Sequence, residues 1–366
     1  MKLTVQRRQL LDVINALGSL VSATAARPAY ANLRLAAMEG KLSVSASDLE
    51  VGAKITVGIE ELKEDGVVLA PYDRLSAILR ECPDESLVVN EENLAMTVTG
   101  KTSSFRVLCE SPEDYEDIEP VSEDGLVEVD RDALAEATRR TAFAVADEEG
   151  PFSLRGIYIR IAGKDMEVVG TDGRRLSFVK KKVKNAGDGE MDGIVPRRAL
   201  EMVAKLPTDG KGGVQLRLEE RQLAVRTEAA MLRAQLIEGQ FPDYDRVIPK
   251  ENKLKVELPT AELLSAVRQA AVMSPEDAPS IRVTLSDKTL LLASESADVG
   301  SARVELACDY KGEECSLLFN PQYIVELLRV VDKEAVRLEA ADSDHAVLIR
   351  AGHGFLYVLM PISESD

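Results

Sequence analysis

"VEVDRDALAEATRRTAF", residues 127–143, reads as a short alternating strand, then a polar pair, then an amphipathic helix. The same order recurs in LTVQRRQLLDVINAL (3–17) and in VELPTAELLSAVRQAAV (256–272). Three copies of one pattern indicate three copies of one structural unit, and such a repeat decides the fold more firmly than any single helix does. In the first and third copies the apolar residues that share a helix face are Leu10, Ile14 and Leu17, and Leu263, Val267 and Ala270.

Further landmarks follow each copy in the same order. A strand, a polar turn and a second strand are expected at 41–57, 165–181 and 289–306. A strand with a Pro at or near the start of a second helix is expected at 66–82, 193–206 and 316–330, and a closing hairpin at 93–109, 221–237 and 345–362. The spacing is regular, since Val44 and Val169 are 125 residues apart and Val169 and Ala293 are 124 apart.

Two connectors rich in Pro and acidic residues, SPEDYEDIEP (111–120) and FPDYDRVIP (241–249), separate the copies. We therefore expect three tandem similar domains at 1–120, 121–249 and 250–366. Each contains two helices on antiparallel sheets of about eight strands, which is an α+β fold. Together the three domains supply six helices.

The charge of the chain is unevenly distributed over these elements. The chain has 366 residues and a formal net charge of −18, whereas the predicted helices sum to +3, so −18 minus +3 leaves −21 on the remainder. Tight non-specific binding to DNA depends on many Lys and Arg contacts that release counterions, and an acidic exterior opposes it. The pattern favours a protein that surrounds a polyanion over one that grips it. The helices counted are 6–17, 71–81, 130–142, 196–206, 260–271 and 321–331.

The number of helices limits what a ring could enclose. Six helices packed about 10 Å apart have their axes on a circle of roughly 19 Å, which leaves roughly 9 Å once a helix width of about 10 Å is subtracted. That opening is narrower than the DNA major groove of about 12 Å. Twelve helices leave about 28 Å, so a ring that admits duplex DNA needs two chains, arranged head to tail.

Other classes of protein are disfavoured. No run of 18 or more apolar residues is present, and the N-terminal segment contains Asp12 and Asn15, so we expect neither a membrane span nor a signal peptide. The four cysteines lack metal-binding spacing, which favours free thiols, a reducing cytoplasm and no metal.

GKTS (100–103) resembles part of a phosphate loop, but Ala95 replaces the leading Gly and a strand follows. His345 and His353 lie in a predicted hairpin without a nucleophile motif, so we expect no catalytic residue and no cofactor.

TDGRRL (171–176) admits two interpretations. The bland one is a turn in which Gly173 supplies a positive φ. The other is a surface on which another protein docks.

The chain resembles the β subunit family of bacterial DNA polymerase III, the sliding clamps, over essentially its whole length. The motifs that carry the resemblance are the MKLTV opening, SDLE (47–50), TDGRRL (171–176), IVPRRAL (194–200), FPDYDRVIP (241–249), FNPQYIVELL (319–328) and YVLMPI (357–362). The resemblance implies the DNA clamp fold, half of a ring-shaped homodimer, and a non-enzymatic processivity factor for DNA replication. It also implies a pocket for short peptide motifs of the replicative polymerase, the clamp loader and repair proteins.

Carried over by position, the resemblance places sixteen residues in the partner-peptide pocket: Leu154, Thr171, Gly173, Arg174, Arg175, Leu176, Pro242, Arg246, Val247, Asp344, Ala346, Val358, Leu359, Met360, Pro361 and Ile362. Arg174 stands where the family often has His. The resemblance also implies that Arg175 and Arg246 lie at the rim of an apolar groove, where they would meet acidic or carboxyl-terminal groups of a partner.

The resemblance also implies which residues face DNA and which form the dimer interface. Residues facing DNA would be Arg7, Arg27, Phe152, Arg197, Arg198 and Lys205. Residues of the dimer interface would be Phe105 and Leu108 of one chain against Val272 and Met273 of the other. The expected partner is duplex DNA, held by topology and without sequence preference. The alternative is a repeat scaffold that binds only proteins and does not encircle DNA.

Overall fold

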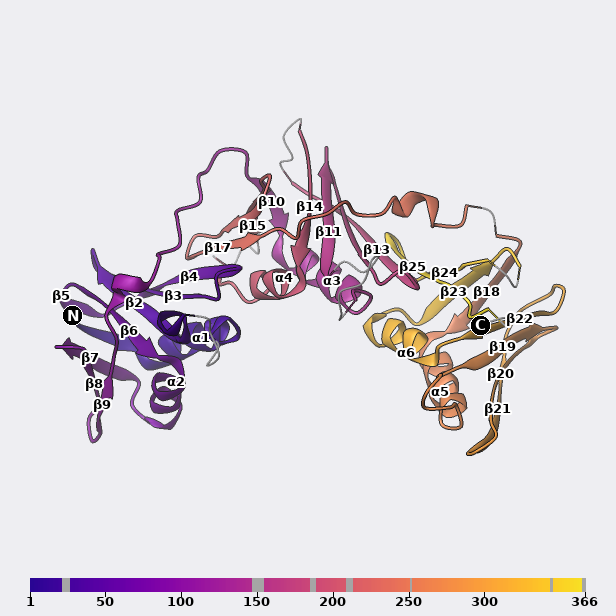
Figure 1. The fold of residues 1–366 in the computed structure, drawn as a ribbon, viewed down its shortest axis with the longest axis horizontal. Helices are drawn as coiled ribbons and strands as arrows, with labels where there is room; N and C mark the ends of the chain where they lie inside the picture. Colours follow the sequence, from indigo (N-terminus) through magenta and orange to yellow (C-terminus); the bar gives the residue numbers. More distant parts are fainter. Residues whose placement is uncertain are drawn as a thin grey trace. The chain divides into compact units, whose positions relative to one another are not determined.

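The computed structural model describes residues 1–21, 27–146, 155–184, 189–208, 213–250, 252–342 and 345–363. Within them the chain forms the helices α1–α6 and the strands β1–β25 (Figure 1). The chain divides into two compact units. Unit 1 comprises Met1–Ala135, Ala162–Lys164 and Val183–Leu236, and unit 2 comprises Glu136–Ile161, Asp165–Lys182 and Ile237–Asp366.

Unit 1 holds the first copy of the repeat and most of the second. Its helices are α1 (Arg7–Leu17), α2 (Tyr72–Glu81) and α4 (Arg197–Val203), and α3 (Arg131–Ala142) begins in it. The strands of the first copy are β1 (Lys2–Gln6), β2 (Asn32–Met38), β3 (Lys41–Ser47), β4 (Val51–Gly58), β5 (Glu61–Glu64), β6 (Gly66–Pro71), β7 (Ser86–Glu92), β8 (Ala95–Thr99) and β9 (Ser104–Leu108). Those of the second copy are β10 (Val127–Asp130), β14 (Glu190–Pro196), β15 (Gly213–Leu218), β16 (Gln222–Arg226) and β17 (Ala230–Gln235).

Two antiparallel sheets organise unit 1. One has the order β5-β1-β7-β8-β9, and the other has the order β10-β15-β16-β17-β4-β3-β2-β6. In the second sheet β17 of the second copy pairs with β4 of the first, with Ala230 opposite Ile55 and Leu232 opposite Ala53. The edges of two neighbouring copies therefore share one ladder of hydrogen bonds, and the sheet crosses the predicted border at residue 120.

Unit 2 holds the third copy and the remainder of the second. Its helices are α5 (Thr260–Ala271) and α6 (Pro321–Val330), together with the end of α3. Its strands are β11 (Gly156–Ala162), β12 (Asp165–Thr171), β13 (Arg175–Lys182), β18 (Leu254–Pro259), β19 (Ile281–Ser286), β20 (Thr289–Ser296), β21 (Gly300–Ala307), β22 (Cys315–Phe319), β23 (Ala335–Ala340), β24 (Val347–Arg350) and β25 (Phe355–Leu359).

The sheets of unit 2 also join two copies of the repeat. Within unit 2 the strands of the larger sheet follow the order β11-β12-β13-β25-β24-β23-β18, and those of the smaller sheet follow the order β21-β20-β19-β22. Strand β13 of the second copy pairs with β25 of the third, with Leu176 opposite Val358. Helices α5 and α6 contact each other, and α5 also contacts β20 and β21 (Figure 1).

The predicted repeat is confirmed element by element. In every copy one strand leads directly into the first helix (β1–α1, β10–α3, β18–α5) and another into the second (β6–α2, β14–α4, β22–α6). The predicted helical faces are confirmed as well, because Leu10, Ile14 and Leu17 are buried in α1. Helix α4 is shorter than predicted, since it ends at Val203, four residues before Pro207. Lys205 therefore lies after the helix and not on it.

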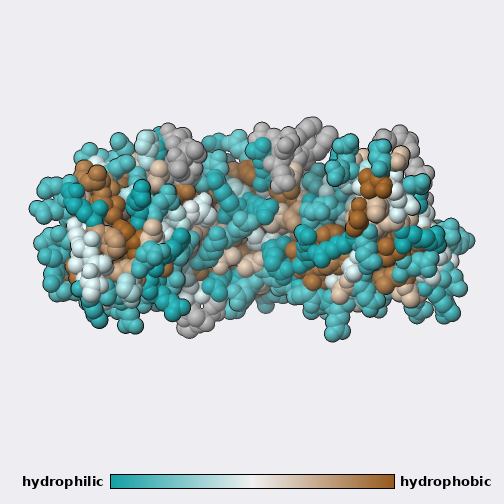
Figure 2. All heavy atoms as spheres, turned by 90° about the horizontal axis from the view of Figure 1, so that it is seen from below, coloured by the Kyte–Doolittle hydropathy of each residue, from teal (hydrophilic) through white to brown (hydrophobic). Residues whose placement is uncertain are grey.

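Buried aliphatic side chains fill the space between helices and sheets, as the fully buried Leu10, Ile14 and Leu17 illustrate. On the face that Figure 2 shows, hydrophilic residues predominate and hydrophobic ones gather in separate small patches. Among the described residues no helix is long and apolar enough to cross a membrane.

Candidate functional site

Unit 2 contains a cavity of about 260 Å³ between the turn that joins β12 to β13, the connector around residue 244 and the end of β25. The residues that line it are Thr171, Gly173, Arg174, Arg175, Leu176, Phe241, Pro242, Tyr244, Val247, Val358 and Met360. They come from the second copy of the repeat, the connector and the third copy, so the local pairing of β13 with β25 creates the cavity.

The turn from Thr171 to Arg175 is held by its own side chains. The Asp172 Oδ1 atom accepts hydrogen bonds from the backbone N–H groups of Arg174 and Arg175, both at 3.0 Å. The Thr171 hydroxyl donates to the Arg175 carbonyl at 2.7 Å. Gly173 has φ 84°, a conformation that glycine adopts without strain. The turn thus presents one rigid wall to the cavity.

The end of β25 forms a second wall. Leu176 and Val358 face each other across the β13–β25 ladder and are 4 % and 1 % exposed. After the strand, the Met360 N–H donates to the Arg174 carbonyl at 3.0 Å, which keeps Met360 beside the turn. The Met360 side chain remains 43 % exposed. The cavity therefore has a buried apolar floor and an accessible apolar edge.

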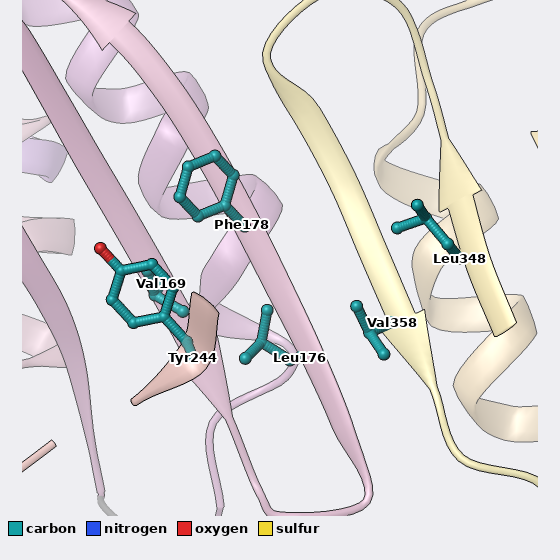
Figure 3. Packing of buried hydrophobic residues seen from close by; sticks show 6 residues of the cluster. All are labelled: Val169, Leu176, Phe178, Tyr244, Leu348 and Val358. Carbon is teal, nitrogen blue, oxygen red and sulfur yellow. The ribbon is translucent and has the colours of Figure 1, made fainter. Parts of the chain in front are cut away.

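Aromatic side chains attach the connector to the sheet. Phe241 stacks on Tyr158 of β11, with ring centroids 4.7 Å apart and planes at 15°. Tyr244 packs in a buried cluster with Val169, Leu176 and Phe178, which Figure 3 shows together with Leu348 and Val358. The connector is in this way fixed as the third wall of the cavity.

A hydrogen bond completes that attachment, because the Tyr244 hydroxyl donates to Glu167 Oε2 on β12 at 2.8 Å. Burial raises the pKa of Glu167, but the hydrogen bonds from Tyr244 and Lys180 outweigh it, so this pKa lies below its ordinary value. Burial and the adjacent Glu167 raise the pKa of Tyr244 well above its ordinary value. At neutral pH the pair is therefore a neutral donor bound to an ionised acceptor.

Arg175 differs from the prediction that placed it at the rim, ready to meet a partner's carboxylate. It is only 8 % exposed, and its guanidinium donates to Asp172, to Glu326 and to the Phe143 carbonyl. Arg175 does line the cavity, but its charge is already paired within the fold, and the sequence could not reveal this partner because Glu326 is 151 residues away in the chain. The exposed cation of this turn is Arg174, for which the described residues provide no side-chain partner.

The cavity brings together nine of the sixteen residues expected in the pocket, namely Thr171, Gly173, Arg174, Arg175, Leu176, Pro242, Val247, Val358 and Met360. Leu359 is buried opposite Arg175 in the ladder, and Ala346 packs against the buried cluster. Arg246 is 85 % exposed and pairs with Asp243 at 2.7 Å, whereas Pro361 and Ile362 follow the lining residue Met360. Leu154 and Asp344 lie outside the described residues.

Sequence reasoning missed Phe241 and Tyr244, although both belong to the quoted FPDYDRVIP motif. Two aromatic residues within four positions of one connector were the available signal, because aromatic rings bury large apolar areas and so indicate that the connector packs against the domain.

The residues expected to face DNA are mostly engaged within unit 1. Arg197 pairs with Glu201 at 2.8 Å, and Arg198 pairs with Asp48 at 2.6 Å and Glu50 at 2.7 Å. Arg7 donates to the carbonyls of Leu79 and Asp84, and Arg27 pairs with Glu116 at 3.4 Å. Lys205 is exposed, and no described residue pairs with its ammonium group. Phe152 lies outside the described residues.

Two of the four residues expected in a dimer interface, Leu108 and Val272, are exposed, whereas Phe105 and Met273 are half-buried. Phe105 and Leu108 belong to β9, the edge strand of its sheet, and Leu108 is 70 % exposed. Val272 follows α5 directly and is 68 % exposed. Met273 lies near the start of β21, because its sulfur is the nearest atom, at 3.9 Å, to a Cβ built on Gly300.

The enzyme-like motifs do not assemble a reactive site. GKTS lies in the turn between β8 and β9, where the Lys101 N–H donates to the Asp84 carboxylate at 2.9 Å. The Asp84 carboxylate thus accepts the hydrogen bond from a backbone N–H group that a phosphate loop would use to bind phosphate. His345 pairs with Asp342 on the surface, and His353 is exposed in the turn between β24 and β25. Among the described residues no group of His, Cys, Asp or Glu could hold a metal ion.

Chemically, the cavity suits a short peptide. Its Leu, Val, Met and aromatic lining favours apolar side chains, and its size fits one or two of them. The surrounding turn and strand end offer polar backbone groups and the Arg174 guanidinium at the edge. Recognition of a linear segment by apolar anchors in a rigid groove is a recurrent mode of peptide binding.

The chain matches family models along nearly all of its length. Residues 1–119 match the N-terminal domain of the DNA polymerase III beta subunit, residues 128–243 its central domain and residues 245–363 its C-terminal domain. The beta sliding clamp of Chlamydia trachomatis is 28 % identical, over 100 % of this chain and 88 % of that protein. That of Pseudomonas putida is 27 % identical, over 99 % and 100 %.

Solved structures agree with these matches. The crystal structure of the DNA polymerase III subunit beta from Pseudomonas aeruginosa superposes with a TM-score of 0.93 at 26 % identity, covering 99 % of this chain and 100 % of that one. The beta subunit from Thermotoga maritima, at 24 % identity and 99 % coverage of both chains, has the same fold with a TM-score of 0.92.

Proposed function

Because this chain belongs to the DNA polymerase III beta subunit family, its function is that of a DNA sliding clamp, and we propose how its residues carry out that function. Two copies form a head-to-tail homodimer that closes around duplex DNA. The cavity in unit 2 binds short peptide segments of the replicative polymerase, the clamp loader and repair proteins. The chain tethers these enzymes and catalyses no reaction itself.

The observation that carries the tethering role is the cavity itself. It is apolar, it has rigid walls, and its edge residues Arg174 and Met360 remain accessible. A linear peptide that inserts apolar side chains there would bury them without requiring the protein to rearrange. The direct test is a titration of fluorescent peptides, with and without paired leucines, into the purified protein. Saturable binding of the leucine peptide alone supports the role, and no binding of either peptide contradicts it.

The dimer is supported by the two exposed edges of the repeat. Strand β9 ends one sheet and β21 ends another, and edge strands have unpaired backbone groups that a second chain can satisfy. Leu108 and Val272 are the most exposed large apolar side chains among the described residues. Six helices per chain then become twelve, which at a packing distance of about 10 Å leave an opening of about 28 Å, wide enough for duplex DNA.

We expect Leu108→Asp to convert the dimer to monomers. Burial of this side chain contributes about 1.5–3 kcal/mol at each of two symmetric contacts. Its loss should therefore raise the dissociation constant of the dimer about a hundredfold or more. Analytical ultracentrifugation should give the mass of two chains for the unaltered protein and of one chain for the variant. Met38→Asp, at a side chain that is 53 % exposed and distant from β9 in the sequence, is the matched control. A monomeric unaltered protein, or a dimeric Leu108→Asp variant, would count against this interface.

We expect Tyr244→Phe to loosen the connector. The substitution removes a hydrogen bond to an ionised carboxylate, which contributes about 1.5–3 kcal/mol. The backbone amides of Arg246 and Val247 donate hydrogen bonds to the carbonyls of Asp243 and Tyr244. Their hydrogens should then exchange with solvent about tenfold faster or more. Hydrogen exchange measured by NMR or mass spectrometry checks this. Tyr310→Phe, which removes a hydroxyl bonded to the Glu313 carbonyl, is the control and should leave these amides unchanged.

The paired arginines of unit 1 favour a second candidate, a scaffold that binds proteins but does not encircle DNA. Arg197 and Arg198 already neutralise acidic side chains of the same molecule, which reduces what they offer to phosphate. Retention on circular DNA separates the two candidates, because only a ring that encloses the DNA depends on the DNA being circular.

A further inference from the structure

Glu326 on α6 lies outside the lining of the cavity, yet it binds a residue that belongs to it. We propose that Glu326 is a positioning residue for the peptide pocket, acting through Arg175, and that it keeps the Arg175 charge from being presented to bound peptides. This inference rests on the proposed function of the cavity as a peptide site. It makes selectivity depend on helix α6, which contributes no residue to the lining of the cavity.

The Arg175 guanidinium is held from three directions. Its Nε atom donates to Asp172 Oδ2 at 2.9 Å, its Nη2 atom to the Phe143 carbonyl at 2.7 Å, and its Nη1 atom to Glu326 Oε2. The Tyr323 ring lies beneath the guanidinium, with the centroid 4.2 Å from Cζ. Arg175 thus meets two carboxylates, a carbonyl and an aromatic face while remaining 8 % exposed.

Glu326 is itself fixed in place. Its second oxygen accepts a hydrogen bond from the Gln322 side chain at 2.7 Å, one turn earlier on α6. The buried Tyr357 hydroxyl of β25 donates to the Tyr323 carbonyl at 3.2 Å, which ties the same turn of the helix to the strand that ends at the cavity. Helix α6 therefore holds its carboxylate in register with Arg175.

Asp172 connects this arrangement to the shape of the cavity. One of its oxygens accepts from the Arg175 side chain, and the other accepts from the two backbone amides that set the turn. If Glu326 loses its charge, the buried guanidinium keeps only one carboxylate and gains by moving toward water. Arg175 lines the cavity, so we expect this movement to disturb the turn and to expose a cation at the cavity.

The test compares two acetylated and amidated peptides that share a pair of leucines and differ only in having Asp or Asn at the flanking positions. Their dissociation constants are measured at low and high salt for the unaltered protein, for Glu326→Gln and for Glu257→Gln. Glu257 pairs with Arg337 on the surface of unit 2, so it controls for the loss of one carboxylate. Gln322→Ala, at an exposed position, removes only the second support of Glu326.

In Glu326→Gln we expect the Asn peptide to bind roughly tenfold more weakly. The Asp peptide should lose clearly less, and its affinity should depend more steeply on salt than in the unaltered protein. Gln322→Ala should change the affinities for both peptides in the same direction by a smaller factor. Glu257→Gln should leave both affinities unchanged. Equal losses for the two peptides with unchanged salt dependence, or no loss at all, would overturn the positioning role. If the unaltered protein binds neither peptide, the proposed function of the cavity fails instead.

Discussion

Met360→Asp should lower the affinity of the cavity for a leucine-containing peptide by at least about tenfold, because burial of a Met side chain contributes about 1.5–3 kcal/mol. Met360 lines the cavity and is 43 % exposed in the free protein, so a bound peptide covers surface that water now reaches. An aspartate at this position would also have to lose water beneath the peptide, which costs further free energy. The fold should persist, since the side chain lies at the accessible edge.

Ile362→Asp is the matched control for this prediction. Ile362 is two residues further along, is 37 % exposed and does not line the cavity, and its N–H donates to the Leu318 carbonyl at 2.7 Å. Isothermal titration of one peptide into the three proteins measures the difference. Equal affinities of Met360→Asp and the unaltered protein would show that peptides bind elsewhere. Equal losses in both variants would point to the whole C-terminal segment and not to the cavity.

The second large effect concerns how DNA is held. A protein with a net charge of −18 gains little from counterion release, and the internal ion pairs of Arg197 and Arg198 reduce it further. Attraction to phosphates should accordingly be weak and easily lost in salt. A closed ring needs no such attraction, because a circular duplex cannot leave without opening the protein or the DNA. Retention should therefore depend on DNA topology far more than on ionic strength.

The repeat and its helices could be predicted because their signals are local. Each helix follows from apolar residues spaced three and four apart, and the three copies reinforce one another. The borders of the compact units could not be predicted in this way. They depend on pairings between copies, such as Ala230 with Ile55 and Leu176 with Val358, and a strand edge carries no sequence mark of its distant partner.

The candidate site shows the same limit. Thr171, Gly173 and Met360 come from motifs that were recognisable by resemblance, and the cavity includes them. Tyr244 acquires its role from Glu167, 77 residues away, and Arg175 from Glu326, 151 residues away. Nothing in TDGRRL distinguishes an arginine that faces a partner from one that is neutralised within the fold.

The most direct test of the central claim loads the protein onto a DNA circle with a clamp loader, washes at about 0.5 M salt and then cuts half of the circles once. Encirclement predicts that the protein stays on intact circles and leaves the linear DNA at least about tenfold faster, in high and low salt alike. Equal rates of loss from circular and linear DNA, or retention that disappears in salt on both, would contradict a ring and favour the scaffold.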